Sequence, residues 1–412
     1  MAIGESYCTD ILYVPHYTHR LSPAFMRFAL LLRGYDFPAR AANEPFRYLE
    51  LGFGRGDSLI AHAASCGGEF WGVDFLSGHC DAAREAAKAA GLGSRCRILH
   101  NSFAEAAAMA EAGELPLFDV VALHGVWSWV DAANREHILR IVRTSLKEGG
   151  AAYVSYNALP GWAVFMPLRD VLSGMMAECA QTAPGTDAET RVRAVMDRLV
   201  ALTETDGAYF RLNPLCGIYL AEMAKKPPAF LAHDFFNPTW RPFSFREAAG
   251  DFLTAGCVFA ASADLFHHAD SFLPPGMADR VREASSSADP YLEESLRDLA
   301  LNTQFRADLF LRSPRRADAG ACRDKLAAAA IRPAVSPEDA LLEITYGLNK
   351  ARLDSTPCRA ILDALARNSG LPTRIGDLPG GLPATENGMR RLIECLSIMR
   401  ETGYILEADP VP

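Results

Sequence analysis

The chain has 412 residues, of which 50% are hydrophobic, and it carries a formal net charge of −9 at pH 7. A chain of this length exceeds one ordinary domain, so we expect roughly two or three domains and a sizeable buried core. The acidic balance argues against a dominant nucleic-acid surface, because binding to phosphates needs clustered Lys and Arg side chains.

Residues 1–45 are interpreted as a lead-in segment ahead of the first sheet strand. A helix is predicted from Leu21 to Leu32, because apolar residues recur at helical spacing, Ser22 suits the N-cap and Pro23 suits the first helical position. Aromatic and histidine side chains precede this helix, namely Tyr7, Tyr13, His16, Tyr17 and His19. The segment is either a flap that packs on the core or a lid over a bound ligand.

From Phe46 onward, strand and helix patterns alternate. Strands are predicted at 47–51, 70–74, 97–100, 118–123 and 151–156, and helices at 58–65, 79–90, 104–112 and 133–146. The glycine pair Gly149-Gly150 marks the end of the last of these helices. Such alternation is typical of an α/β fold built on a parallel, doubly wound sheet.

After the fifth predicted strand the alternation breaks. Three helical patterns occupy 163–180, 188–205 and 213–224, before a helix at 243–255 and a strand at 257–263 resume the α/β pattern. We therefore interpret residues 161–229 as a helical insertion in a sheet-forming domain that spans 46–272. Because the insertion follows the carboxyl end of the fifth strand, where open α/β sheets bind ligands, it either covers a substrate or forms a dimer interface.

The rest of the chain is predicted to be mainly helical. Residues 273–334 are expected to form a helical linker or regulatory region, with a helical pattern from Ala284 to Arg312. Residues 335–412 show helices at 337–349, 357–368 and 386–402 and a strand at 404–407, which resembles a winged-helix unit. Such units bind DNA when they are basic, but residues 386–400 carry only three arginines against two glutamates. A role in protein interaction or dimerisation is therefore favoured.

The most informative motif lies at the end of the first predicted strand. Glu50 is followed by Gly52, Gly54 and Gly56, and the next predicted strand ends at Asp74. Glycines at a strand-to-helix turn let the backbone approach a ligand, and a carboxylate at the tip of the second strand lies where ribose hydroxyls bind. The third glycine comes one residue too early for the dinucleotide fingerprint. A NAD-type site and a glycine turn without a ligand are the alternatives.

This motif resembles the binding signature of class I S-adenosylmethionine-dependent methyltransferases, which have a Rossmann-like sheet. The resemblance implies that Glu50 accepts a hydrogen bond from the backbone or from the methionine amine of the cofactor, and that Asp74 accepts from both ribose hydroxyls. The cofactor site that the resemblance implies consists of Glu50, Gly52, Phe53, Gly54, Gly56, Asp74, Phe75, Asn101, Ser102, Phe103 and His124. Residues 101–103 would contact the adenine, although the acidic residue that is frequent at this place in the fold is absent.

Two turns at the predicted sheet edge carry the candidate catalytic residues. His124 and Trp127 follow the fourth predicted strand, where class I methyltransferases hold the acceptor beside the methyl group. The histidine would take up a proton from an amine, and Trp127 and Trp129 would wall an apolar channel that also favours a cation. Tyr156 and Asn157 end the fifth strand and would orient an amine by hydrogen bonds. The alternatives are structural: the tryptophans pack the turn, His124 bonds the backbone, and Asn157 caps its turn.

The resemblance extends to a bacterial family of class I methyltransferases with a methyltransferase regulatory domain. It rests on residues 49–56, on 124–130 with 153–162, and on the block from Phe230 to Asp264. Characterised relatives include lysine methyltransferases that act on bacterial outer-membrane proteins, which implies a protein lysine as acceptor. A small-molecule N- or O-methyltransferase and a binding module with a silent active site are the alternatives. His233, Asp234 and Trp240 of the block are interpreted as structural.

The ten cysteines show no C-x-x-C pair and no Cys/His cluster at metal-ligand spacing. This pattern favours reduced thiols over a disulfide framework, and no metal is expected. The first residues show neither a basic nor an apolar signal segment, and the longest uncharged run, 149–168, contains Pro160 and Gly161. The sequence therefore predicts a cytoplasmic protein without membrane insertion, with a methyl acceptor as its partner.

Overall fold

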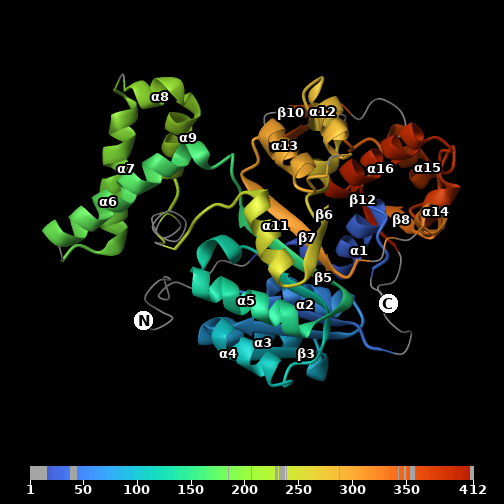
Figure 1. Ribbon diagram of the computed structural model, residues 1–412, viewed down its shortest axis with the longest axis horizontal. Coiled ribbons are helices and arrows are strands. Elements are labelled where there is room, and N and C mark those ends of the chain that lie inside the picture. The colour runs from blue at the N-terminus through green and yellow to red at the C-terminus, as the bar shows by residue number, and fades with distance from the viewer. Residues whose placement is uncertain are drawn as a thin grey trace.

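The fold is known from a computed structural model (Figure 1). It describes residues 16–37, 44–183, 185–205, 207–227, 231, 237, 239–286, 288–314, 316, 318–341, 343–347, 349–352 and 358–408. Tyr7, Tyr13, His233 and Asp234, which the sequence singles out, lie outside the described residues.

A seven-stranded sheet organises the molecule, in the order β3-β2-β1-β4-β5-β7-β6. Its strands are β1 (Arg47–Leu51), β2 (Glu69–Asp74), β3 (Cys96–His100), β4 (Phe118–Leu123), β5 (Leu146–Asn157), β6 (Cys257–Ser262) and β7 (Phe305–Arg312). β1 to β5 run parallel, and β7 is antiparallel to both β5 and β6. The predicted α/β sheet with its first five strands is confirmed.

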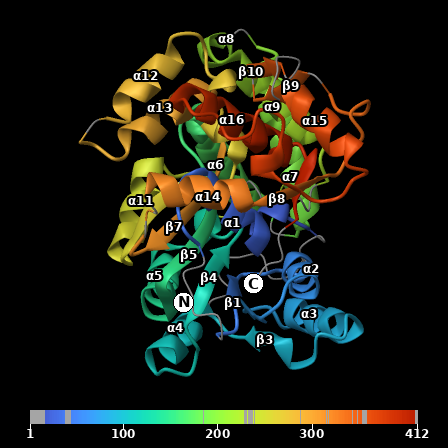
Figure 2. The same ribbon diagram turned by 90° about the vertical axis from the view of Figure 1, so that its right-hand side faces the viewer.

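Helices cover both faces of this sheet (Figure 2). The helices α1 (Pro23–Leu32), α2 (Asp57–Ser65) and α3 (Ser77–Ala89) pack on one face, and α4 (Phe103–Glu111), α5 (Ala132–Ser145) and α11 (Phe245–Thr254) pack on the other. Short 3-10 turns lie at His19–Leu21, Gly93–Arg95, Trp127–Trp129, Ala163–Phe165, Leu265–His268, Asp270–Phe272 and Ile375–Asp377. Local signals set the helix starts: Ser102 and Ser244 form capping boxes with Glu105 and Glu247.

The predicted helical insertion is present as a separate lobe. It consists of α6 (Met166–Thr182), α7 (Ala188–Thr203), α8 (Ala208–Leu212), which the sequence did not predict, and α9 (Pro214–Ala224). Figure 1 shows these helices projecting from the side of the sheet-forming part. The lobe has its own apolar cluster, which includes Phe165, Val195, Met196 and Leu220. Its core is therefore separate from the core of the sheet.

The prediction of helix from Ala284 to Arg312 is wrong for its second half. After α12 (Met277–Ala284) and α13 (Leu292–Leu301), residues 305–312 form β7 and insert between β5 and β6. Arg306 and Asp308 are charged residues within this strand, and their side chains are buried and bond each other. The sheet thus extends past the expected boundary at residue 272.

The C-terminal part mixes helices and strands. α14 (Ala319–Ala328), α15 (Cys358–Arg367) and α16 (Glu386–Glu401) share a core with an antiparallel sheet of β11 (Thr373–Arg374), β8 (Ala330–Pro333) and β12 (Ile405–Glu407). The helix predicted at 337–349 is wrong, because β9 (Glu343–Tyr346) and β10 (Asn349–Arg352) form a hairpin there. β8 precedes residue 335, so the expected boundary at that residue divides this small sheet.

Helix α1 links the two cores. Phe25 and Met26 join the core under the large sheet, whereas Phe28 and Leu32 join the C-terminal core. The guanidinium of Arg400 in α16 lies 4.7 Å from the ring centre of Phe25. The lead-in helix is therefore packed on two sides.

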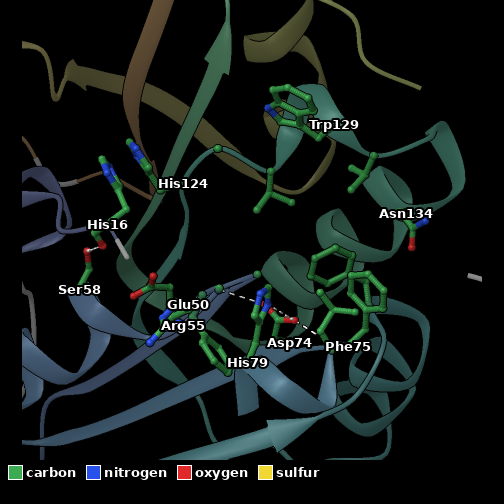
Figure 3. A pocket seen from close by; sticks show the side chains of 18 of the residues that line it. His16, Glu50, Arg55, Ser58, Asp74, Phe75, His79, His124, Trp129 and Asn134 are labelled. Carbon is green, nitrogen blue, oxygen red and sulfur yellow. Dashed lines mark hydrogen bonds and ion pairs between the residues drawn. The ribbon is translucent and has the colours of Figure 1, made fainter. Parts of the chain in front are cut away.

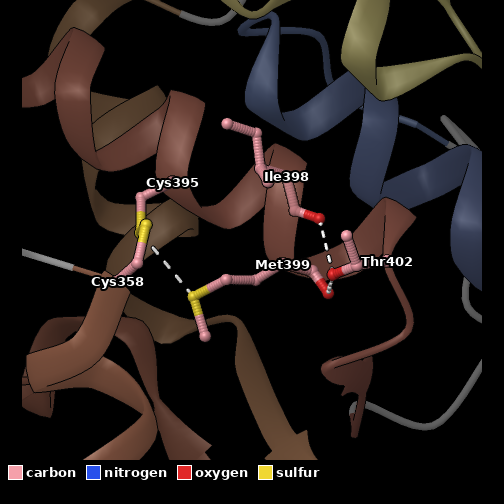
Figure 4. The surroundings of a disulfide bond; sticks show 5 residues. All are labelled: Cys358, Cys395, Ile398, Met399 and Thr402. Carbon is pink, nitrogen blue, oxygen red and sulfur yellow. Dashed lines mark hydrogen bonds between the residues drawn. A yellow bond between two sulfur atoms is a disulfide. The ribbon is translucent and has the colours of Figure 1, made fainter. Parts of the chain in front are cut away.

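A disulfide joins α15 to α16 (Figure 4). Cys358 and Cys395 are bonded, with their Cα atoms 5.6 Å apart, and the Sδ of Met399 lies 3.6 Å from the Sγ of Cys395. This pair corrects the expectation of reduced thiols, because the packing of two helices brings together cysteines that are distant in sequence. The free cysteines among the described residues are Cys66, Cys80, Cys96, Cys179, Cys216, Cys257 and Cys322.

Candidate active site

A pocket opens at the carboxyl ends of the central parallel strands (Figure 3). Its walls come from the glycine turn after β1, the end of β2, the turns after β3, β4 and β5, the first residue of β7 and the lead-in segment. Of the predicted site residues, the pocket is lined by Glu50, Gly52, Phe53, Gly54, Asp74, Phe75, Asn101, Ser102, Phe103, His124 and Asn157. Tertiary structure thus brings together residues from five different turns.

The glycine turn needs glycine for two separate reasons. Gly52, Gly54 and Gly56 have φ values of 68°, 60° and 82°, in the left-handed region that favours glycine. A Cβ on Gly52 would lie 2.7 Å from Val126 Cγ2, and a Cβ on Gly56 would lie 2.9 Å from the Cβ of Ala83. Nothing lies within 4 Å of a Cβ built on Gly54. Gly52 and Gly56 therefore close the turn, while Gly54 presents bare backbone to the pocket.

The carboxylate of Asp74 is held in place by the backbone around it. Its Oδ2 accepts from the Gly54 N–H at 3.0 Å, its Oδ1 accepts from the Leu76 N–H at 2.9 Å, and the Nδ1 of His79 lies 3.3 Å from Oδ1. A carboxylate has about four lone-pair sites, so acceptor capacity remains for a ligand. Asp74 is thus a fixed acceptor at the pocket wall.

Glu50 is a second buried carboxyl group in the pocket lining, beside Asp74. It is 4% exposed, and its Oε2 has no hydrogen-bond partner within the described part of the chain. Burial raises the pKa of Glu50 to about 8, and the negative charge of Asp74 adds to the rise. A buried carboxyl group without a partner costs free energy, so a cationic ligand group at this point would relieve that cost.

In the turn after β3, fewer side chains are available to contact a ligand than the sequence suggests. Ser102 caps α4, and its hydroxyl donates to Glu105 Oε2 at 2.9 Å while accepting from the Glu105 N–H. The Asn101 N–H donates to the Asp74 carbonyl oxygen at 3.1 Å. The Asn101 side chain and the ring of Phe103 are consequently the groups at this turn that suit a purine.

His124 belongs to a hydrogen-bonded network under the pocket. Its Nδ1 lies 2.9 Å from the Tyr153 hydroxyl and 3.1 Å from Ser155 Oγ, and Ser155 Oγ accepts from the Gly125 N–H. Burial lowers the pKa of His124 to about 3, and the positive charges of His16 and Arg20 add to the effect. A neutral imidazole with this pKa is a poor proton acceptor, which argues against the proton uptake suggested by the sequence.

Two predicted catalytic residues do not line the pocket. Trp127 is fully buried against Phe243 and Phe252, and the Tyr156 hydroxyl donates to Asp308 Oδ2 at 2.7 Å. Both side chains sit in the same apolar core: Tyr156 points there from β5, and Trp127 from the 3-10 turn after β4. The structure therefore gives neither residue access to a substrate.

Residues beyond the predicted site set also line the pocket. Trp129 lies at the end of the pocket opposite His16 and His124, whose rings are 5.8 Å apart (Figure 3). Phe305 enters from β7, which was predicted as helix. The remaining additional lining residues are Leu21, Arg55, Asp57, Ser58, Leu76, His79, Gly125, Val126, Val130, Asp131 and Asn134. Two of these residues had a sequence signal: Trp129 as a predicted wall of the channel after the fourth strand, and His16 through its place in the aromatic lead-in.

No group of three or more His, Cys, Asp or Glu residues in the described ranges is placed to hold a metal ion. In the same part of the chain, every helix is either too short or too polar to cross a membrane.

Comparison with known proteins shows to which class of enzyme the chain belongs. A family described as a methyltransferase domain matches residues 49–150, and one described as "Predicted methyltransferase regulatory domain" matches residues 227–312. The chain is an S-adenosylmethionine-dependent methyltransferase. The first match spans the glycine turn, Asp74 and His124, and the second spans α11, β6 and β7.

This methyltransferase has relatives over most of its length. An uncharacterised protein of Synechocystis sp. is 29% identical over 98% of this chain and 77% of its own length. An uncharacterised protein of Rickettsia prowazekii is 26% identical over 65% of this chain and 46% of its own length. The structure of PKMT2 from Rickettsia typhi in complex with AdoHcy aligns with a TM-score of 0.66 and 18% identity, over 96% of this chain and 77% of that chain. This last likeness establishes the fold.

The pocket fits S-adenosylmethionine, the cofactor of this class. When bound, the cofactor supplies a methyl group on a positively charged sulfur that is already activated for transfer. The unpaired Glu50 Oε2 suits the cofactor's ammonium group, the fixed Asp74 suits a ribose, and the open space at Gly54 leaves room beside the backbone. The donor set of the pocket therefore agrees with the cofactor.

Binding of S-adenosylhomocysteine at pH 7 is expected to release about one proton, because Glu50, with a pKa of about 8, must ionise to pair with the ligand's ammonium group. Titration calorimetry in two buffers of different ionisation enthalpy measures this release. The Glu50→Gln enzyme should bind more weakly and release none, whereas Glu111→Gln, an exposed carboxylate paired with Arg140, should keep the release. Binding by the wild-type enzyme without proton release would contradict the assignment.

Proposed function

We propose that this methyltransferase transfers a methyl group to the side-chain amine of a protein lysine. The observation that carries the proposal is the composition of the pocket. It holds the two carboxyl groups that suit the cofactor, Trp129 lies at its opposite end from His16 and His124 (Figure 3), and Asn157 also belongs to its lining. An amine therefore finds an aromatic face and an amide next to the cofactor site.

The cofactor-binding roles follow from the contacts around each group. Glu50 receives the ammonium group, Asp74 receives the ribose hydroxyls, and the Gly52–Gly56 turn lies along the methionine part. Phe53, Phe75 and Phe103 supply apolar surface, and Asn101 serves the adenine. Because the reaction needs little beyond alignment of the amine with the methyl group, positioning accounts for most of the acceleration.

The acceptor end of the pocket suits a lysine in two ways. Trp129 offers a ring face that attracts an approaching ammonium group, and apolar surroundings then lower the pKa of the amine so that it loses its proton. Asn157 is fixed at its backbone, since its N–H donates to Ser128 Oγ at 2.9 Å and its carbonyl accepts from the Phe243 N–H at 2.9 Å. We infer that its side-chain oxygen accepts a hydrogen bond from the neutral amine, since Asn157 lines the pocket.

The insertion favours a polypeptide over a metabolite. A series of edge-to-face ring contacts leads from the pocket toward the lobe: the ring centres of Trp129 and Trp240 lie 6.3 Å apart, and those of Trp240 and Trp162 lie 4.9 Å apart. Beyond them the lobe carries exposed apolar side chains, namely Val171, Leu202, Leu212, Leu215 and Ile218. A lid for a small molecule would turn such side chains inward, whereas a surface that contacts a polypeptide leaves them exposed.

A labelling experiment tests the acceptor class. Purified enzyme and S-adenosylmethionine labelled on its methyl group are added to a bacterial lysate, which is then separated into protein and small-molecule fractions. Label is expected in the protein fraction and, after acid hydrolysis, in methylated lysine. The Asp74→Ala enzyme serves as the control for label that does not depend on the cofactor site. Label confined to the small-molecule fraction would favour the alternative, a small-molecule N- or O-methyltransferase.

The cellular setting and the organisation of the chain are part of the same proposal. We infer a bacterial cytoplasmic enzyme that does not act on nucleic acid, which agrees with the net charge of −9 and the seven free cysteines among the described residues. Residues 1–45 contribute a lid, the part that begins at residue 46 holds the cofactor, and the lobe at 161–229 meets the acceptor. The C-terminal part from about residue 335 serves contacts between proteins, with a homodimer as one arrangement.

A further inference from the structure

The lead-in residues 16–21, here called the strap, form one wall of the cofactor pocket. His16 and Leu21 line the pocket. The strap is attached to the first turns of α2: the Thr18 N–H donates to Ser58 Oγ at 2.9 Å, and His62 Nε2 lies 3.1 Å from the Thr18 carbonyl oxygen. The position of the strap therefore helps to define the space that the cofactor occupies.

Arg20 connects the strap to parts of the chain that are distant in sequence. Its Nε donates to Glu401 Oε1 at 3.0 Å, and its guanidinium lies 3.3 Å from Asp264 Oδ2. Glu401 is the last residue of α16 in the C-terminal part, and Asp264 follows β6 in the regulatory region. Both carboxylates are buried, so their interaction with Arg20 is little screened by water.

Hydrogen bonds from groups other than Arg20 also hold the Glu401 and Asp264 carboxylates in place. Glu401 Oε2 accepts from the Leu265 N–H at 3.1 Å. Asp264 accepts from the Tyr346 hydroxyl at 3.0 Å and from the Phe266 N–H at 3.2 Å. Because their own elements orient both acids, they form a rigid receptor for the guanidinium. The arrangement couples the regulatory region, the hairpin of β9 and β10, and α16 to the strap.

We propose that Glu401 and Asp264 are positioning residues for cofactor binding, which hold the strap against the pocket through Arg20. The C-terminal part thereby controls how long the cofactor stays bound. Loss of the Glu401 carboxylate leaves Arg20 with one acidic partner, and the strap opens more often. The effect falls on the dissociation rate, since an open strap removes a wall of the occupied site.

The test is a comparison of two variants in the same helix. Glu401→Gln removes the charge that holds Arg20. Glu394→Gln is the matched control, because Glu394 also lies in α16 and accepts a backbone N–H, from Ser271 at 2.7 Å, without touching the strap. Calorimetry and stopped-flow measurements on the full-length chain then give the affinity and the dissociation rate of S-adenosylhomocysteine.

Glu401→Gln is expected to raise Kd about tenfold, through faster dissociation with an unchanged association rate. Glu401→Asp, which keeps the charge on a shorter side chain, should recover part of the loss, and Glu394→Gln should bind like the wild type. Wild-type affinity and dissociation rate in Glu401→Gln would overturn the proposal. Equal losses in Glu394→Gln would also overturn it, because the effect would then reflect the stability of α16. None of these results depends on which acceptor is methylated.

Discussion

Replacement of Asp74 by alanine is expected to weaken the binding of S-adenosylhomocysteine about 100-fold or more. A hydrogen bond to a charged group is worth about 1.5–3 kcal/mol, and the proposed ribose contact uses two. Their loss costs roughly 3 kcal/mol, which is about a 100-fold change in Kd. The variant also loses the acceptor that holds the Gly54 N–H and the Leu76 N–H, so the turn itself loosens.

Two further variants separate binding from folding in this experiment. Asp74→Asn keeps one acceptor oxygen and should show an intermediate loss. Asp119→Asn changes another buried carboxylate, which accepts from the Arg47 N–H at 2.8 Å and lies outside the pocket lining. Calorimetry should find its affinity within about twofold of the wild type, as expected for an independent site. Unchanged affinity in Asp74→Ala would remove the central assignment of the cofactor site.

The Arg306→Met substitution is expected to lower the free energy of unfolding by about 3–5 kcal/mol. Arg306 is a buried residue of β7 and donates to three acidic side chains at 2.8–2.9 Å, those of Glu294, Asp298 and Asp308. Without the guanidinium these carboxylates face one another in a region that excludes water. Guanidinium chloride unfolding at pH 8 measures the loss.

The loss in Arg306→Met should depend on pH. Burial raises the pKa of Asp298 to about 7 and also raises that of Asp308, and removal of Arg306 takes away the charge that opposes this rise. A group whose pKa is raised in the folded state stabilises the fold at low pH and loses this contribution as the pH rises through the folded-state value. The loss of unfolding free energy caused by Arg306→Met should therefore be smaller at pH 6 than at pH 8. A deficit that is constant across this range would contradict the explanation.

An exposed arginine provides the control for this prediction. Arg359 pairs with Asp363 in α15, and both side chains are more than a third exposed. Arg359→Met should change the free energy of unfolding by at most about 0.5 kcal/mol, because surface ion pairs contribute little. A similar loss of unfolding free energy in Arg359→Met and Arg306→Met would mean that the buried charge cluster stabilises the fold no more than a surface ion pair does.

Much of the cofactor site could be predicted from local patterns. β1 to β5 alternate with helices whose periodicity is visible in the sequence, and the Gly52–Gly56 turn with Asp74 has a spacing that only a strand-to-helix crossover explains. These features depend on neighbours within a few residues, so the sequence carries them directly.

The position of β7 and the placement of several pocket side chains depend on contacts between segments distant in sequence, which local sequence patterns do not indicate. β7 was mistaken for helix because Arg306 and Asp308 are acceptable in a buried strand only with partners from α13 and β5. The candidate residues Trp127 and Tyr156 lie in the core, while His16 and Phe305 enter the pocket from segments far away in sequence. Which side of a strand faces the pocket is set by packing, and the amino-acid type alone does not reveal it.

The sequence by itself thus determined the α/β sheet, the glycine turn and the acid that follows the second strand, since these arise from short-range periodicity and backbone conformation. Tertiary structure alone decided the antiparallel β7, the burial of Trp127 and Tyr156 in the core, and the contact of Arg20 with Glu401. The physical reason is that a buried charge or ring becomes stable only when distant segments supply its hydrogen bonds and its apolar surroundings.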